Sequence, residues 1–279
     1  GRCGGGEERP LGALRLRRAE RDAERAHEVK EKREGPLVGA LEVVEGEDGG
    51  APVRRREQEG DDGVEEPHAL AGRVLAAARL KLPCNVVAVA PLTENMPSGS
   101  AQRPGDIVRS FGGKTVEVLN PDAEGRLVLA DALEYARTLK PQAVIDLATL
   151  TGAVIVALGR HAAAVFSNDA ALCKRIVAAA DATAERVWQL PLWDDYNEQL
   201  KSDFADIKNV GGRPAGAITA AKFLETFAEG LSWAHLDIAG AAWVETGPDS
   251  PKKEYLPTGA SGYGVRLLVR ILQDWKAGT

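Results

Sequence analysis

From residue 69 onward, apolar positions follow the regular periods of secondary structure. Short apolar runs bounded by polar or turn residues are typical of buried strands, and longer segments with apolar residues every three or four positions are typical of helices. The short runs predict strands at 85–92, 143–148 and 233–238, with shorter strands at 108–110 and 115–118. The longer segments predict helices at 69–80, 127–139, 170–184, 217–229 and 263–275.

The order of these elements predicts the fold class. Strands alternate with helices, and several of the strands are apolar on both sides, which indicates a sheet covered on both faces. The sequence therefore predicts an α/β fold over residues 70–279, with three layers and a mixed, mostly parallel sheet between helices.

The first 69 residues have a different character. Nearly half of them are charged, Glu, Arg and Gly dominate, and 37–44 is the one short apolar run. Such a composition buries too little apolar surface to offset the loss of chain entropy, so we expect residues 1–69 to be an atypical charged, disordered segment. The alternative is non-native sequence from a shifted reading frame, which native peptides spanning 20–80 would exclude.

Composition narrows the classes of function. Apolar residues make up 44% of the chain, enough for a sizeable core, and the net charge of -6 argues against nucleic-acid binding. No apolar run approaches the roughly 18 residues of a membrane helix. Cys3, Cys84 and Cys173 have no paired spacing, which favours a reducing compartment. We expect a cytoplasmic protein, with an organellar location as the alternative.

The densest group of reactive side chains is at 120–126, between a predicted strand and a predicted helix. In an extended loop, Asp122 and Glu124 would point the same way and offer two hard oxygen ligands to a divalent metal. Gly125 permits a tight turn, and Arg126 adds a permanent positive charge able to hold an anion or a developing oxyanion. The alternative is ordinary capping of a helix N-terminus by acidic residues.

Residues 120–133 read NPDAEGRLVLADAL and resemble the signature of the leucyl aminopeptidase (cytosol aminopeptidase) family, usually NTDAEGRL followed by the same helix. Companion motifs occur in the family's order, so the resemblance covers about residues 70–276. They are TENMPSG at 93–99, RPGD at 103–106, TLTGA at 149–153, SDFADIKNVG at 202–211, WAHLDIAG at 233–240 and GASGYG at 259–264.

The resemblance implies a metalloaminopeptidase, a hydrolase that releases N-terminal, preferentially leucine-like, residues from peptides with two divalent metal ions (Mn or Zn). It implies that Asp122 and Glu124 are metal ligands and that Arg126 is the catalytic arginine, which holds a bicarbonate. It implies that substrate is bound at Asn120, Leu150 and Gly152. Peptides are the implied partners, together with further copies of the chain in a hexamer.

The sequence departs from the family in two respects. The family's other metal-binding side chains, one Lys and two Asp, precede the signature, and no matching segment occurs before residue 69. Pro121 also replaces the usual Thr and lacks an N–H. The alternative function is therefore a catalytically inactive subunit with the aminopeptidase fold and a structural or binding role. We interpret His161 and His235 as isolated structural histidines, and Ser261 as part of a glycine-rich entry to the last helix.

Overall fold

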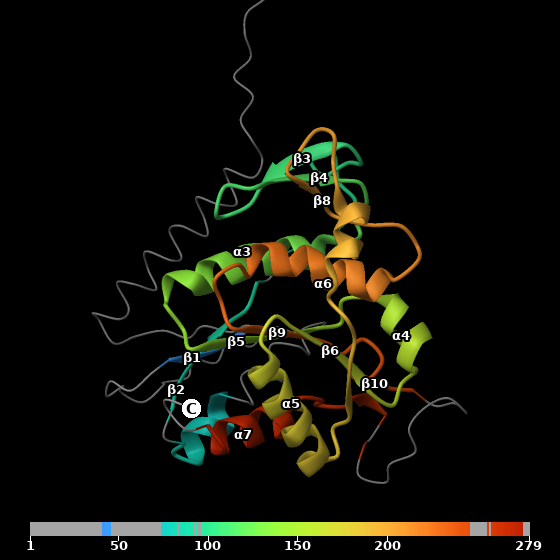
Figure 1. The fold of residues 1–279 in the computed structure, drawn as a ribbon. Helices are drawn as coiled ribbons and strands as arrows, with labels where there is room; N and C mark the ends of the chain where they lie inside the picture. The colour runs from blue at the N-terminus through green and yellow to red at the C-terminus, as the bar shows by residue number, and fades with distance from the viewer. Residues whose placement is uncertain are drawn as a thin grey trace, which may run out of the picture.

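The computed structural model describes residues 41–45, 74–82, 84–91, 93, 96–245, 256 and 258–275. A six-stranded sheet with the order β2-β1-β5-β9-β6-β7 is at its centre (Figure 1). Its strands are β1 (Leu41–Glu45), β2 (Asn85–Val89), β5 (Ala143–Ala148), β6 (Ala163–Ser167), β7 (Val187–Gln189) and β9 (Trp233–Asp237).

Helices cover both faces of this sheet. Helices α3 (Glu124–Thr138) and α6 (Gly216–Phe227) lie on one face, and α5 (Ala170–Thr183) and α7 (Val265–Gln273) lie on the other (Figure 1). The short helix α4 (Gly152–Leu158) follows β5, and the 3-10 helix η1 (Asp194–Leu200) packs against α6. The predicted three-layer α/β architecture is confirmed.

The prediction of a mostly parallel sheet is wrong for the described strands. The pairs β5–β9 and β6–β7 are parallel, whereas β1–β2, β1–β5 and β6–β9 are antiparallel. The length of α4 explains the direction of β6. Seven helical residues span roughly 10 Å, about half the length of a six-residue strand, so the chain re-enters the sheet at the edge that β5 has just left.

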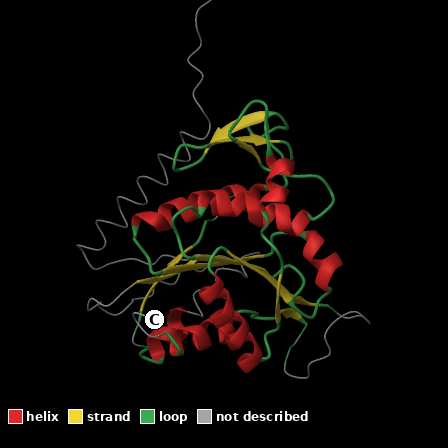
Figure 2. Ribbon diagram, viewed as in Figure 1, coloured by secondary structure: helices red, strands yellow, loops and turns green. Residues whose placement is uncertain are grey.

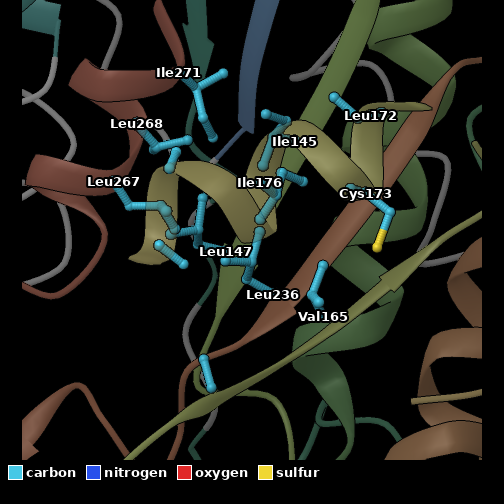
Figure 3. Packing of buried hydrophobic residues seen from close by; sticks show 14 of the residues in the cluster. Ile145, Leu147, Val165, Leu172, Cys173, Ile176, Leu236, Leu267, Leu268 and Ile271 are labelled. Carbon is cyan, nitrogen blue, oxygen red and sulfur yellow. The ribbon is translucent and has the colours of Figure 1, made fainter. Parts of the chain in front are cut away.

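The alternation of side chains along each strand divides the core in two. Ile145, Leu147, Val165 and Leu236 point toward α5 and α7, where they pack with Leu172, Ile176, Leu267, Leu268 and Ile271 (Figure 3). The intervening residues Val144 and Trp233 instead join the cluster formed with α3 and α6, which includes Leu133, Phe223 and Phe227.

Two small sheets lie outside these layers (Figure 2). Strands β3 (Asp106–Arg109), β4 (Thr115–Val118) and β8 (Ile207–Lys208) form one of them beyond α3 and α6. Strands β10 (Trp243–Val244) and β11 (Gly259–Ala260) form the other. Because β4 leads directly into residues 119–123 and α3, the first small sheet positions the predicted acidic site.

Most predicted elements are present, with shifted ends. The strands predicted at 85–92, 143–148 and 233–238 correspond to β2, β5 and β9. The predicted helix 69–80 is helical at 74–79, and residues 69–73 lie outside the described part of the chain.

The charged segment 1–69 differs from its prediction at one place. Residues 41–45 form β1, which lies between β2 and β5, so these five residues are not disordered as expected. The rest of residues 1–69 lies outside the described part of the chain. Within the described residues, no helix combines the length and apolar character needed to span a membrane.

Candidate active site

The candidate site lies where the parallel strands β5 and β9 end. Ala148 and Asp237 are paired in register, so the segments that follow both strands emerge at the same edge of the sheet. Open α/β sheets usually bind ligands at the carboxyl ends of parallel strands. The start of α3 reaches the same place, because a Cβ at Gly125 would lie 3.7 Å from Leu150 Cδ1.

The acidic residues do not lie in an extended loop. Helix α3 begins at Glu124, three residues before the predicted start, and the Asn120 side chain accepts a hydrogen bond from Asp122 N at 3.0 Å. The turn at 120–123 therefore replaces the extended geometry in which the two carboxylates would converge. Simple capping is not supported either, because Ala123 occupies the N-cap and no side chain caps the helix.

A second segment fixes this turn. Asn209, which is fully buried, accepts hydrogen bonds from Leu119 N (2.8 Å) and Asn120 N (3.2 Å) and donates to Asn120 O at 2.7 Å. Its own carbonyl accepts a hydrogen bond from Arg126 Nη1 at 2.7 Å. One asparagine thus links the start of the acidic turn to the guanidinium in α3, although the sequence analysis did not single it out.

Arg126 and Glu124 carry buried polar atoms without partners. Arg126 is 8% exposed, and its Nε has no hydrogen-bond partner, nor has Glu124 Oε2. Burial lowers the pKa of Arg126 to about 10, against the opposing effect of the negative charges of Asp237 and Glu124. The guanidinium is therefore still cationic at neutral pH. Asp122, by contrast, is exposed.

The turn after β5 is held by Asp237. This buried carboxylate accepts a hydrogen bond from the Thr151 hydroxyl at 2.6 Å and another from Leu150 N at 3.2 Å. Thr151 in turn caps α4, because its Oγ1 accepts from Val154 N at 3.2 Å. Gly152, the first residue of α4, is exposed. The structure thus brings Leu150 and Gly152 to the edge where α3 begins.

Deeper in the core, a charged pair lies on the same face of the sheet as Asp237. His235 Nδ1 lies 2.5 Å from Asp146 Oδ1, and Asp146 Oδ2 accepts from Trp233 Nε1 at 2.6 Å. His235 is therefore structural on one side, as expected, whereas its Nε2 is buried and has no partner. His161 is exposed.

The sequence analysis missed Asp146 and Asp237 as site-forming residues. Both belong to runs that were noticed for other reasons: Asp146 interrupts an apolar strand, and Asp237 lies in the WAHLDIAG motif. A carboxylate inside an otherwise apolar strand was the available signal, because a buried charge needs partners. Ser261, as expected, lies at the entry to α7, where its hydroxyl donates to Ala241 O at 2.7 Å.

The donor chemistry of the site suits a divalent cation, but its donors are too few. Glu124 Oε2 is a buried hard oxygen without a partner, and Asp122 lies two residues away. Within the described residues, however, no group of three or more His, Cys, Asp or Glu side chains is arranged to hold a metal ion. Two carboxylates alone bind a divalent ion weakly, because affinity grows with the number and charge of the ligands.

Fold and site together define a class: an α/β protein with carboxylates and a buried arginine at the carboxyl edge of its sheet, where enzymes of this architecture bind their ligands. Residues 68–269 match the catalytic-domain model of the cytosol aminopeptidase family, and the chain belongs to this family.

Two bacterial relatives agree with this assignment. The chain is 58% identical over 207 residues to a probable cytosol aminopeptidase of Roseiflexus castenholzii, which covers 74% of this chain and 42% of the relative. It is 51% identical over 245 residues to a probable cytosol aminopeptidase of Geobacter sulfurreducens, which covers 87% and 48%.

A solved structure is also similar. A lysine-to-glutamate mutant of tomato leucine aminopeptidase matches with a TM-score of 0.65 and 42% identity, over 74% of this chain and 39% of that chain. The chain thus spans less than half the length of the relatives it matches.

Proposed function

We propose that the chain supplies the carboxylate and arginine side of a metal-dependent aminopeptidase that releases N-terminal, preferentially leucine-like, residues from peptides by two-metal hydrolysis. The observation that carries the proposal is the pair of unpartnered buried atoms, Glu124 Oε2 and Arg126 Nε. An unsatisfied buried polar group costs about 1–3 kcal/mol, so two of them in one helical turn favour a ligand-binding role.

Each side chain has a distinct role in the proposal. Asp122 and Glu124 would hold divalent metal, either Mn or Zn. A metal ion bound there would supply Lewis acidity and would acidify its bound water. Arg126 would hold an anion such as bicarbonate, because it stays cationic and keeps a free donor in a buried place.

The backbone after β5 would orient the peptide substrate. The Leu150 carbonyl would accept a hydrogen bond from a substrate amine, and the bond from Leu150 N to Asp237 would hold this backbone segment in place. Gly152 presents no side chain at the exposed start of α4, so the approach of a peptide there is unobstructed. Asn120 would line the site from the opposite side, with its side chain shaping the acidic turn.

The second candidate is an inactive subunit with the aminopeptidase fold. It is kept as a candidate because the sequence before residue 69 has no segment that matches the family's upstream metal-binding side chains. Assembly into a hexamer and a cytoplasmic location, as the family resemblance implies, are compatible with both candidates.

A metal and turnover assay separates the two candidates. The full chain, incubated with Mn or Zn, is expected to bind two ions per chain and to hydrolyse a leucine anilide. Glu124→Gln should reduce kcat about 10³-fold, which corresponds to about 4 kcal/mol of barrier. Glu198→Gln, at an exposed surface ion pair, is the matched control and should leave kcat unchanged.

Three outcomes are informative. Two bound ions with turnover that Glu124→Gln removes support the enzyme. Folded protein with neither metal nor turnover supports the inactive subunit. Turnover that survives Glu124→Gln overturns the assignment of the site.

A further inference from the structure

Asn209, directly after β8, bonds both the segment before the acidic turn and the helix after it. It is completely buried, and its own N–H donates to Glu117 O at 2.9 Å, which fixes its backbone to β4. Its side-chain Oδ1 accepts Leu119 N at 2.8 Å and Asn120 N at 3.2 Å, and its Nδ2 donates to Asn120 O at 2.7 Å. Its carbonyl oxygen accepts a hydrogen bond from Arg126 Nη1 at 2.7 Å.

The acidic turn is closed by bonds of its own. Asn120 Oδ1 accepts Asp122 N at 3.0 Å, and Asn120 O accepts Ala123 N at 3.1 Å. These local bonds shape the turn, but they do not attach it to the structure beside it. The side chain of Asn209, which is 89 residues from Asn120 in the sequence, supplies such an attachment.

The two proposed metal ligands lie on either side of the point where this turn becomes a helix. Asp122 belongs to the turn, whereas Glu124 and Arg126 belong to the start of α3. Because the loop is not extended, the alternation of side chains along a strand does not bring the two carboxylates together. Their separation depends instead on how the turn is held relative to α3.

We propose that Asn209 is a positioning residue of the aminopeptidase reaction: it holds the acidic turn in place beside α3, so that Asp122 and Glu124 face one metal-binding site. This inference rests on the proposed function. Asn209 acts through Asn120 and Arg126 and does not itself contact metal or peptide. The loss of a residue that orients metal ligands in this way costs roughly 10- to 100-fold in metal affinity or activity.

Asn168 offers a matched control at the opposite edge of the sheet. It directly follows β6, whose last residue pairs with the beginning of β9, whereas the candidate site lies where β9 ends. Its side chain also bridges two backbone groups: Oδ1 accepts Trp233 N at 2.9 Å, and Nδ2 donates to Leu231 O at 3.0 Å. Asn168→Ala therefore removes bonds of the same kind without touching the acidic turn.

The test compares Asn209→Ala with Asn168→Ala in the full chain. The first readouts are kcat and KM for a leucine anilide and the Mn²⁺ dissociation constant from titration calorimetry. The second is the distance between the carboxylates of Asp122 and Glu124 in crystal structures of the wild type and the variants. Urea unfolding shows whether the two substitutions destabilise the fold to a similar extent.

We expect Asn209→Ala to lower kcat about 10²-fold and to change KM less than about threefold, because a displacement of about 1 Å suffices for such a loss. Mn²⁺ should bind about tenfold more weakly, and the distance between the two carboxylates should change by about 1 Å. Asn168→Ala should lower the urea midpoint as well, but it should keep the wild-type kcat, Mn²⁺ affinity and carboxylate distance.

Where the wild type is active, an unchanged kcat or an unchanged carboxylate distance in Asn209→Ala would overturn the proposal. A wild type that neither binds Mn²⁺ nor turns over substrate refutes the proposed function alone, since the distance still decides whether Asn209 positions the turn. If Asn209→Ala does not fold, Asn209→Asp decides. It keeps the acceptor for Leu119 N and Asn120 N but loses the donation to Asn120 O, and a wild-type distance in this variant refutes the role of Asn209.

Discussion

The two faces of the central sheet are built from the same strands but differ sharply in chemistry. Toward α5 and α7, strand β5 places Ile145 and Leu147 in an entirely apolar cluster (Figure 3). Toward α3 and α6, the residue between them is Asp146, and β9 adds His235 and Asp237, all fully buried. One face therefore stabilises the fold through apolar packing, and the other holds buried charged groups next to the candidate site.

The buried charges on the face toward α3 and α6 carry a desolvation penalty. Moving a charge out of water is unfavourable unless a partner and hydrogen bonds offset the loss. Asp146 has His235 and Trp233, and Asp237 has Thr151 and the backbone. The loss of unfolding free energy caused by a substitution should therefore depend on pH on the polar face. On the apolar face, the loss should be the same at every pH.

Removal of Asp146 should have the largest effect on stability. Asp146→Ala leaves His235 and the Trp233 indole without their acceptor, and breaking a buried pair in this way costs about 3–5 kcal/mol. Chemical unfolding of the full chain in urea, followed by Trp fluorescence, measures the loss. A loss below about 1 kcal/mol would contradict the view that this face depends on its ion pair.

Asp146→Ala should also change the pH dependence of the free energy of unfolding. Burial lowers the pKa of His235, but the charge and hydrogen bond of Asp146 outweigh burial, so the pKa of His235 is raised. A raised histidine pKa contributes stability fully below about pH 6.5, and this stability is lost as pH rises through the folded-state value. The difference between wild type and Asp146→Ala should therefore shrink from pH 5.5 to pH 8.5.

A cavity on the apolar face should have a slightly smaller effect. Ile176 is completely buried among β5, β9 and α7, and Ile176→Ala should cost about 3 kcal/mol through lost burial and an unfilled space. Ile176→Val, which removes one methylene, should cost about 1 kcal/mol. The same urea experiment at pH 5.5 and 8.5 should give equal losses, and a clear pH dependence would break the distinction between the two faces.

The apolar face is also the part that the sequence predicts best. Runs such as 143–148 and 233–238 are recognisable because each strand is almost continuously apolar. Strand β6 was missed, since AAVFS is short and begins just after His161. Helix α4 was missed because GAVIVAL is rich in β-branched residues, which are typical of strands.

The polar face was harder to predict because its partners are far apart along the chain. The bonds of Asp237 to Leu150 and Thr151 span 86 or 87 residues, and that of Arg126 to Asn209 spans 83. The periodicity of apolar residues is a local signal and does not reveal pairs that are so far apart in the sequence. The acidic turn was found from its residue types, but its extended geometry was wrong, because α3 begins at Glu124.

Two carboxylates on α3 hold the hairpin that leads into the site, and a substitution among them has the smallest predicted effect. Asp131 accepts Phe111 N at 2.8 Å, and the buried Glu134 accepts Gly112 N at 2.5 Å. A Cβ at Gly112 would lie 2.2 Å from Glu134 Oε1, so a larger residue at this position would have to displace the carboxylate. The turn between β3 and β4 is thereby pinned to α3.

Asp131→Asn should stabilise the protein at neutral pH by about 1–2 kcal/mol. Burial, together with the charge of Glu134, raises the pKa of Asp131 to about 6, against the hydrogen bond from Phe111. A raised carboxyl pKa means that the folded state binds the proton more tightly, so ionisation lowers stability as pH rises from about 4 to about 6. Asparagine keeps an acceptor for Phe111 N without that charge.

The gain in stability, measured by urea unfolding, should be full at pH 7.5 and vanish near pH 4. Asp181→Asn, on the exposed side of α5, should change stability by less than about 0.5 kcal/mol. A gain in stability at pH 4 equal to that at pH 7.5 would show that burial of the Asp131 charge is not its cause. The pH-dependent behaviour of the polar face would then not extend to these carboxylates.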